Sequence, residues 1–359
     1  MPRDMSDADS ILRDVFGFDS FRPGQSEIVE AVTQGENVLA IMPTGGGKSL
    51  CFQLPALARH GVTVVISPLI ALMRDQVRGL REAGVAAGAL TSANTDEEND
   101  AVWDMLHHDF RPDYLRIGEL RRALDVPLAA FTATADAETQ EEIANRLFDG
   151  HAPRTFLRGF DRPNIHLMFS PKNKPRQQIL QFAAARKDQS GIVYCGTRAK
   201  TETLAQALNA EGHSACAYHG GMEAEQRRHV EARFATEDGL IVVATVAFGM
   251  GVDKPDIRWV AHADLPKSIE AYYQEIGRAG RDGAPAETLT LYGADDIRLR
   301  RSQIDEGLAP PERRHADHGR LNALLGLSEA LECRRKTLLG YFGDRDVTCG
   351  YCDLCDNPA

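Results

Sequence analysis

The stretch Met42–Ser49, MPTGGGKS, decides the fold together with the two runs that flank it. The apolar run Asn37–Met42 (NVLAIM) before it is typical of a buried strand, and Lys48–Ala58 (KSLCFQLPALA) after it is typical of a helix. A glycine-rich turn between a strand and a helix aims backbone N–H groups at phosphate oxygens. In such a loop Lys48 reaches the β- and γ-phosphates, and the Ser49 hydroxyl binds Mg²⁺. The stretch therefore predicts a nucleoside triphosphate site.

Two features of this loop qualify the prediction. Met42 stands where the general pattern has glycine, and an ordinary glycine-rich turn is the alternative interpretation. The strand and the helix on either side favour the phosphate loop. The predicted nucleotide contacts are Thr44, Gly45, Gly46, Gly47, Lys48 and Ser49.

Short β-branched runs alternate with helix-period runs over the first 300 residues. The strand candidates are Asn37–Met42, Val62–Ser67, Val126–Thr134, Gly191–Gly196, Leu240–Val246 and Trp259–Asp264. The helix candidates are Pro68–Ala83, Asp136–Phe148, Thr201–Glu211 and Ala224–Thr236. This alternation predicts an α/β protein with parallel sheets covered by helices on both faces. It is too long for one nucleotide-binding lobe, so we expect two tandem lobes, residues 1–158 and 159–300, followed by a helical subdomain, residues 301–359.

Composition and charge restrict the partners. No apolar run approaches the roughly 18 residues that a membrane span needs. The start, MPRDMSDADS, has no secretory signal pattern, so we expect a cytoplasmic protein without a membrane partner. The net charge of −11 gives no support for nucleic-acid binding, which local basic clusters would have to provide. The candidate clusters are Arg298, Arg300 and Arg301, then Arg313 and Arg314, then Arg334, Arg335 and Lys336. Such runs are more often solvated helix faces.

Four of the seven cysteines gather near the C-terminus, at Cys333, Cys349, Cys352 and Cys355. An odd number of cysteines without a secretory signal argues against a disulfide framework. Four thiolates at this spacing suit a closed tetrahedral Zn²⁺ site, and an Fe–S cluster uses the same ligands. The helix-period run Leu321–Glu332 would place Cys333 at its end. Four ordinary free thiols are the alternative.

Three side chains late in the chain have the spacing of one helix face. Gln274, Arg278 and Arg281 stand at positions i, i+4 and i+7 within YQEIGRAGRDG. A guanidinium that a second lobe brings to a bound nucleotide can stabilise the charge on the γ-phosphate in the transition state. We therefore predict that Lys48, Gln274, Arg278 and Arg281 are catalytic, with a structural arginine ladder as the alternative.

Several segments resemble motifs of the RecQ family of ATP-dependent DNA helicases. The run Phe16–Gln25, FGFDSFRPGQ, resembles the adenine-recognition motif, in which a glutamine reads the adenine edge and an arginine packs nearby. The resemblance implies these roles for Gln25 and Arg22, and an amide can accept from and donate to one base edge at once. It also implies RecA-like lobes, with ATP, Mg²⁺ and Zn²⁺ as cofactors, and it favours zinc over an Fe–S cluster.

Seven further segments follow in the family order. They are SPLIALMRDQV (67–77, motif Ia), FTATAD (131–136, motif III), GFDRPNI (159–165, the hinge), GIVYCGTRAK (191–200, motif IV), YHGGM (218–222), TVAFGMGVDKP (245–255, motif V) and YQEIGRAGRDG (273–283, motif VI). The resemblance implies DNA contacts by Ser67 and His219. The phrase HDFRPDY (108–114) resembles the second half of a loop that senses single-stranded DNA, which implies DNA contacts by His108, Phe110 and Arg111.

A DEAH-type motif is missing, although this class of enzyme needs its Asp for Mg²⁺ and its Glu to activate water. The similar letters Asp96–Asn99 (DEEN) follow no buried strand and are typical of the acidic first turn of a helix. The family order indicates that about 50 residues are absent near residues 106–107, which is one and a half strand–helix units. The missing strand should be central in the first sheet, so its absence should leave neighbouring strands without partners and expose apolar faces.

Three functions are open at this point. The resemblance implies an enzyme that hydrolyses ATP, moves 3′-to-5′ on single-stranded DNA and unwinds partly duplex DNA in repair and recombination, mainly through phosphate contacts. The missing DEAH motif favours instead a catalytically inactive DNA-binding remnant, unless the natural protein carries the absent residues. An RNA helicase or another two-lobe translocase is disfavoured by the adenine motif together with the cysteine cluster.

Overall fold

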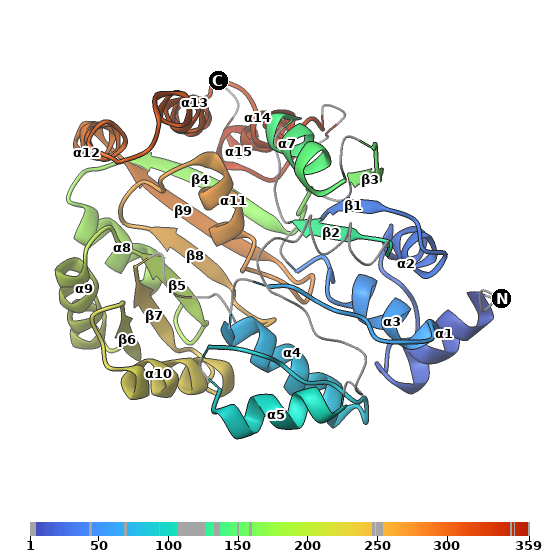
Figure 1. Cartoon of the computed structure of the whole chain (residues 1–359). Helices are drawn as coiled ribbons and strands as arrows, with labels where there is room; N and C mark the ends of the chain where they lie inside the picture. Colours follow the sequence, from blue (N-terminus) through green and yellow to red (C-terminus); the bar gives the residue numbers. More distant parts are fainter. Residues whose placement is uncertain are drawn as a thin grey trace. The chain divides into compact units, whose positions relative to one another are not determined.

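The computed structural model describes residues 5–42, 45–67, 70–92, 94–105, 126–132, 137–148, 151–157, 160–245, 248, 254–344, 347 and 349–357. The chain divides into two compact units, Met1–Gly159 and Phe160–Ala359. Each unit holds a parallel β-sheet of the RecA-like kind and is described by itself (Figure 1). Among the described helices, none has both the length and the apolar character needed to cross a membrane.

In the first unit, the strand that leads into the phosphate loop is central in the sheet. The described strands are β1 (Val38–Ile41), β2 (Ala129–Thr132) and β3 (Arg154–Leu157), and β1 pairs in parallel with both others. The described helices are α1 (Met5–Asp14), α2 (Gln25–Thr33), α3 (Leu50–Ala58), α4 (Ile70–Glu82), α5 (Asp96–Met105) and α7 (Ala137–Leu147). Apolar side chains of α2, β1 and α3 form one cluster, and α1 packs on α2 and α3 through Leu12 and Leu54 in a second cluster. Burial of each such side chain contributes roughly 1.5–3 kcal/mol, which fixes the loop between β1 and α3.

The prediction of a strand over Val62–Ser67 is wrong. Residues 62–67 have no regular secondary structure, and the Val64 and Ile66 side chains are 47% and 51% exposed. A strand forms only where its N–H and C=O groups find a partner strand. In the sheet as far as it is described, β2 and β3 are the two edges, the β2 side chains are only half buried, and residues 62–67 pair with neither strand.

The second unit has a larger sheet. Its strands are β4 (Ile165–Pro171), β5 (Gly191–Tyr194), β6 (Ala215–Tyr218), β7 (Ile241–Ala244), β8 (Trp259–His262) and β9 (Ala286–Tyr292), in the spatial order β4-β9-β8-β5-β7-β6. Every pairing among them is parallel. The helices between them are α8 (Pro175–Ala184), α9 (Arg198–Ala210), α10 (Ala224–Thr236) and α11 (Ile269–Ile276).

Helices cover both faces of this second sheet, as the alternation predicts (Figure 1). On one face, α8 and α9 pack on Val193, Ile241 and Trp259, all of which are fully buried or nearly so. On the opposite face, α11 brings Tyr272 against His262 with ring centroids 5.7 Å apart. The packing is so close that a Cβ on Gly191 would lie 2.1 Å from the Trp259 ring.

The C-terminal helices form a small zinc-binding subdomain of the second unit. They are α12 (Ala294–Asp305), α13 (Pro311–Ser328), α14 (Arg334–Tyr341) and α15 (Asp353–Asp356). The predicted helix Leu321–Glu332 is therefore corrected: α13 begins ten residues earlier and ends at Ser328. Cys333 begins the next helix, because its sulfur accepts the amide of Lys336 and caps α14. The boundary between residues 300 and 301 stays a prediction.

Candidate nucleotide and zinc sites

The phosphate loop has a tight conformation between β1 and α3. Gly45 and Gly47 have φ angles of 81° and 78°, in the left-handed region that favours glycine. A Cβ on Gly47 would lie 2.2 Å from Gln25 Nε2, so close packing also requires glycine here. Thr44 lies outside the described residues, and its predicted contact stays a prediction. The structure brings together the other predicted nucleotide-binding residues, Arg22, Gln25, Gly45, Gly46, Gly47, Lys48 and Ser49.

Gln25 and Arg22 pack against this loop from the start of α2. Gln25 is 3% exposed, and its Oε1 accepts the Arg22 amide at 2.8 Å. Its Nε2 donates to the carbonyls of Gly46 at 3.4 Å and Gly47 at 3.2 Å. Arg22 Nη1 donates to the Gly45 carbonyl. The Gln25 amide is thus held against the phosphate loop, and its predicted role in adenine recognition stays a prediction.

Lys48 and Ser49 are oriented by neighbouring groups. Lys48 Nζ donates to the Met42 carbonyl at 3.0 Å, and Ser49 Oγ accepts from Gln76 Nε2 at 2.5 Å. Gln76 lies on α4 and itself accepts from Gln53 at 2.9 Å. Sequence reasoning quoted Gln76 only within motif Ia and missed its contact with the predicted Mg²⁺ ligand. Residue spacing alone gives no signal for this contact.

The prediction that Gln274, Arg278 and Arg281 share one helix face is wrong. Helix α11 carries Gln274 and ends at Ile276. Arg278 and Arg281 stand in the segment 277–283, which we call the motif VI turn. Gly280 has a φ of 56° there, which an α-helix does not accommodate. The positions of Arg278 and Arg281 therefore depend on the conformation of this turn and on the residues that contact it.

Tyr194, at the end of β5, supports Arg278 from within the sheet. Burial raises the pKa of Tyr194 to about 12 against the attraction of Arg278, to which it hydrogen-bonds, so the phenol stays protonated at neutral pH. Its ring stacks on His262 with centroids 5.4 Å apart. His262 Nε2 in turn contacts Glu275 Oε2 at 2.9 Å, both side chains being buried. Sequence reasoning missed all three residues, since each stands in an apolar or motif-like run.

The four predicted zinc ligands converge. The sulfurs of Cys333, Cys349, Cys352 and Cys355 all lie within 4.8 Å of one another. A tetrahedral Zn²⁺ with Zn–S bonds of about 2.3 Å separates its sulfurs by about 3.8 Å, so the cluster fits the ion with little contraction. All seven cysteines are free thiols, which excludes a disulfide framework in the described chain. Burial opposes charge on Cys349, but the Tyr351 amide, Cys333 and Arg335 outweigh it and lower the pKa of that thiol.

The cysteine cluster docks on the edge strand of the second sheet. Cys352 forms a β-bridge with Leu167 of β4, and the Asp353 carboxylate accepts the Phe169 amide at 3.0 Å. Arg334 Nε donates to the same carboxylate at 2.9 Å. These bonds satisfy backbone groups that the edge of a sheet would otherwise leave open.

The structure does not test the predicted DNA contacts. His108, Phe110 and Arg111 lie outside the described residues. Ser67 is half buried at the end of the irregular stretch 62–67. His219 is 6% exposed, accepts the Gly221 amide on Nδ1 at 3.2 Å and contacts Glu202 at 3.0 Å through Nε2. All these DNA contacts stay predictions.

One predicted basic cluster is corrected. Arg334 and Arg335 are 6% and 3% exposed and face the interior, so only Lys336 of that cluster reaches solvent. The interior holds these two charges because backbone carbonyls and carboxylates bind them. Arg300 also donates to a carbonyl, that of Leu265.

Three sequence families match consecutive parts of the chain. The DEAD/DEAH box helicase family matches residues 22–103, the helicase conserved C-terminal domain matches residues 172–283, and the RecQ zinc-binding family matches residues 294–356. Together with the two parallel sheets and the phosphate loop, they define a protein of the two-lobe helicase class with a zinc-binding module.

Relatives narrow that class. The chain is 40% identical over 394 residues to the ATP-dependent DNA helicase RecQ of Haemophilus influenzae, with 97% of this chain and 63% of that protein covered. It is 38% identical over 341 residues to the ATP-dependent DNA helicase RecQ of Synechocystis sp., with 80% of this chain and 71% of that protein covered. The chain belongs to the RecQ family. It spans less than two thirds of the length of the Haemophilus and Pasteurella multocida relatives, 63% and 62%.

Solved structures share the fold at low sequence identity. The DUF1998 helicase MrfA, bound to DNA and AMPPNP, matches with a TM-score of 0.68 and 19% identity over 97% of this chain and 59% of that one. Dbp5 of S. cerevisiae, bound to gle1 and ip6, matches with a TM-score of 0.61 and 16% identity over 88% of this chain and 96% of that one. At this identity the likeness concerns the fold alone.

Proposed function

We propose that this protein is an ATP-dependent DNA helicase that moves 3′-to-5′ on single-stranded DNA and unwinds duplex DNA in repair and recombination. The packing of Gln25 on the phosphate loop carries the proposal, because on ATP binding its amide can exchange the bonds to the loop carbonyls for bonds to the adenine edge. Membership of the RecQ family supports DNA as the substrate. The related helicase MrfA is bound to DNA in its solved structures.

All the chemical roles of ATP hydrolysis except those of the acidic motif have a candidate in this chain. Lys48 would bind the β- and γ-phosphates, and Ser49 would hold Mg²⁺, which would neutralise charge on the phosphates. Arg278 and Arg281 would act on the γ-phosphate, where a guanidinium stabilises the transition state as water attacks phosphorus and ADP leaves.

Hydrolysis also needs the acidic pair that the sequence lacks. The alignment with the Haemophilus relative runs over 394 residues whereas this chain has 359, so at least 394 − 359 = 35 of its positions have no counterpart here. The DEAD/DEAH match ends at residue 103, close to the expected gap. Exposed Val64 and Ile66 and the half-buried β2 agree with a sheet that lacks a strand. We propose that the natural protein carries the additional strand and its acidic motif between α5 and β2.

The alternative is a catalytically inactive, DNA-binding member of the family. It follows if the deletion is physical, because Lys48 and the motif VI arginines cannot replace the base that activates water. The mass of the natural protein separates the two cases. A product matching 39.4 kDa has no additional segment.

ATP hydrolysis by the purified protein, with and without single-stranded DNA, tests the proposal. We expect DNA-stimulated turnover that the Lys48→Ala variant abolishes. DNA binding without turnover would establish the inactive alternative. Stimulation by RNA equal to that by DNA would overturn the assignment to DNA.

A further inference from the structure

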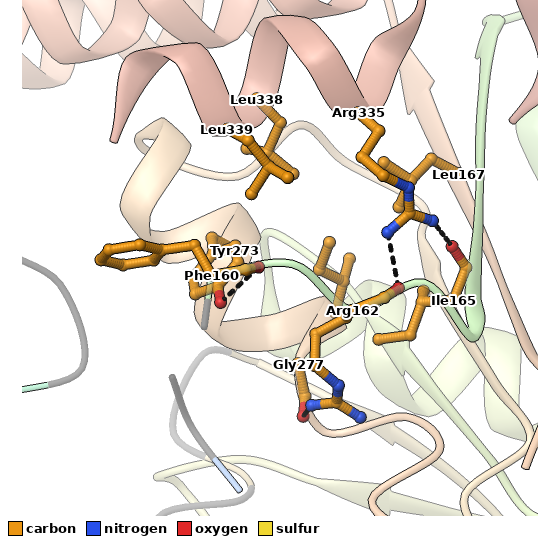
Figure 2. A pocket seen from close by; sticks show the side chains of 10 residues that line it. Phe160, Arg162, Ile165, Leu167, Tyr273, Gly277, Arg335, Leu338 and Leu339 are labelled. Atoms are coloured by element: carbon orange, nitrogen blue, oxygen red, sulfur yellow. Dashed lines mark hydrogen bonds between the residues drawn. The ribbon is translucent and has the colours of Figure 1, made fainter. Parts of the chain in front are cut away.

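Two arginines of the second unit, the buried Arg335 and the half-buried Arg162, lie in succession between α14 and the motif VI turn (Figure 2). Arg335 descends from α14 and Arg162 points from the entry segment of the second unit, residues 160–165, toward Gly277. All of these residues belong to one compact unit. No step of the proposed nucleotide chemistry uses either arginine.

Arg335 joins the cluster to the entry segment. It is 3% exposed, and its Nη1 donates to Asp161 Oδ1 at 2.8 Å and to the Arg162 carbonyl at 2.6 Å. Its Nη2 donates to the Ile165 carbonyl at 2.5 Å. Arg335 stands two residues after Cys333 of the cluster, whose sulfur accepts the Lys336 amide and caps α14. A metal that held Cys333 would therefore fix the start of the helix that carries Arg335.

Arg162 joins the entry segment to the turn. Its Nη1 donates to the Gly277 carbonyl at 3.1 Å, and its Nη2 donates to Ala279 at 2.8 Å and Gly280 at 2.9 Å. These carbonyls lie in the segment that carries Arg278. Since the turn is not helical, the carbonyls of Gly277 and Ala279 lack regular helical partners, and the guanidinium supplies one for each. The Gly280 carbonyl also accepts from Asn164 Nδ2 at 2.9 Å and from the Gly283 amide at 3.0 Å.

Aromatic packing stiffens the same connection. Phe160 stacks on Phe342, at the end of α14, with centroids 4.8 Å apart. Tyr273 of α11 donates its hydroxyl to the Phe160 carbonyl at 3.0 Å. The entry segment is thus held between the zinc-binding subdomain and motif VI by side chains from both.

We propose that Arg335 and Arg162 are positioning residues that make the conformation of the motif VI turn depend on the metal-loaded cysteine cluster. A metal held by the four sulfurs would fix Cys333 at the start of α14. From there Arg335 holds the carbonyls of Arg162 and Ile165, and Arg162 holds the carbonyls of the turn. A cluster without metal loosens a turn that it does not touch. That this turn acts on ATP rests on the proposed function, whereas the connection itself does not.

Hydrogen–deuterium exchange of the zinc-loaded chain tests the connection without nucleotide or DNA. We expect Arg335→Lys and Arg162→Lys each to speed exchange in the motif VI turn by roughly tenfold, since both leave buried carbonyls without partners. Two amides of the turn are informative. The Gly280 amide donates to the Ile257 carbonyl at 2.8 Å, and the Gly283 amide donates to the Gly280 carbonyl at 3.0 Å. Removal of zinc from the unchanged protein with a chelator should speed exchange of the same amides. This measurement does not depend on whether a variant folds.

Arg334→Lys is the matched control. Arg334 precedes Arg335 on α14, is equally buried and binds the Leu327 and Ser328 carbonyls and Asp353 instead of the entry segment. We expect it to leave the turn unchanged. Unchanged exchange in the turn with Arg335→Lys or after chelation overturns the proposal, as does equal acceleration by Arg334→Lys or acceleration spread over α9. Because turnover is not measured, these outcomes do not depend on whether the protein is an active helicase.

Discussion

The sheets of the two units differ in how fully their apolar residues are covered. In the second unit, Val193 and Val243 are fully buried between helices on one face of a six-stranded sheet. In the first unit, Val64 and Val65 are 47% and 50% exposed beside a sheet of which three strands are described. Both runs have the composition of a strand. The difference shows that an apolar, β-branched run becomes a strand only when a neighbouring strand is present to pair with it.

The edges of the two sheets show the same difference. The outer edge of β4 is covered by the cysteine cluster through Cys352 and Asp353. The outer edge of β2 pairs with no strand among the described residues, and its side chains are half buried. Among the described residues, an edge of the second sheet is thus covered by the cysteine cluster, whereas the phosphate loop of the first unit is formed beside a sheet with an uncovered edge.

Loss of the metal should have the largest effect, and it should be confined to the second unit. We expect Cys349→Ser to lower the melting temperature of this unit by roughly 10 °C or more, because a structural zinc contributes directly to folding. The matched control is Cys216→Ser, a half-buried cysteine outside the cluster. Calorimetry of both variants, with zinc content measured alongside, checks this. Equal shifts for the two variants would show that the cluster does not hold the edge of β4.

Asp264 should give the next largest effect, with a pH dependence. Burial opposes its charge, but hydrogen bonds from Lys172 at 2.8 Å, Lys200 at 2.5 Å and the Gly196 amide outweigh it and lower the pKa of Asp264 from 3.8 to about 2. Because the folded pKa is depressed, its stabilisation is present above the unfolded value near 3.8 and is lost as the pH falls toward 2.

We therefore expect Asp264→Asn to lower the free energy of unfolding by about 2 kcal/mol at pH 7. The difference between the variant and the natural residue should shrink between pH 4 and pH 2. Urea unfolding at pH 7 and pH 3 measures both values. A difference that is constant over this range would mean that the charge of Asp264 does not stabilise the second sheet.

Gly47→Ala tests whether the first unit has a formed nucleotide site despite its incomplete sheet. The added Cβ would displace Gln25 Nε2, so we expect ATP affinity to fall about tenfold through the loss of the base reader. Gly84→Ala is the matched control, since Gly84 has almost the same φ, 77°, but no atom within 4 Å of an added Cβ. Titration with a fluorescent ATP analogue should therefore separate the two variants. Equal affinities would contradict the role of Gln25.

The smallest expected effect comes from comparing one buried valine of the second unit, Val193, with one exposed valine of the first, Val64. We expect Val193→Thr to cost about 1–2 kcal/mol, because it buries a hydroxyl without a prepared partner, and Val64→Thr less than about 0.5 kcal/mol. Chemical denaturation of each variant measures both costs. An equal cost at Val64 would mean that a further strand covers it in the natural protein, which would remove the difference between the sheets and support the additional segment.

Sequence reasoning located what depends on local spacing. Composition and period predict features that short-range rules determine. These are the phosphate loop, the four cysteines, the helix over Ala224–Thr236 and the strands near β1, β5, β7 and β8. The strands β3, β4, β6 and β9 were missed. The alternation of β9 (AETLTLY) is a strand signal that could have been used, whereas β3 and β6 have only four residues each and depend on pairing with buried neighbours.

By itself, the sequence determined the class of fold, the phosphate loop, the zinc ligands and the family, since each is a local pattern of residue types. Only the tertiary structure decided that Arg278 and Arg281 leave the helix, that residues 62–67 form no strand, and that Arg334 and Arg335 are buried. In each case the deciding partner is distant in the sequence. The guanidinium of Arg162 binds the Ala279 carbonyl, 117 residues later in the sequence. Arg335 binds the Arg162 carbonyl, 173 residues earlier. Spacing along a chain carries no information about such contacts, because folding alone brings the partners together.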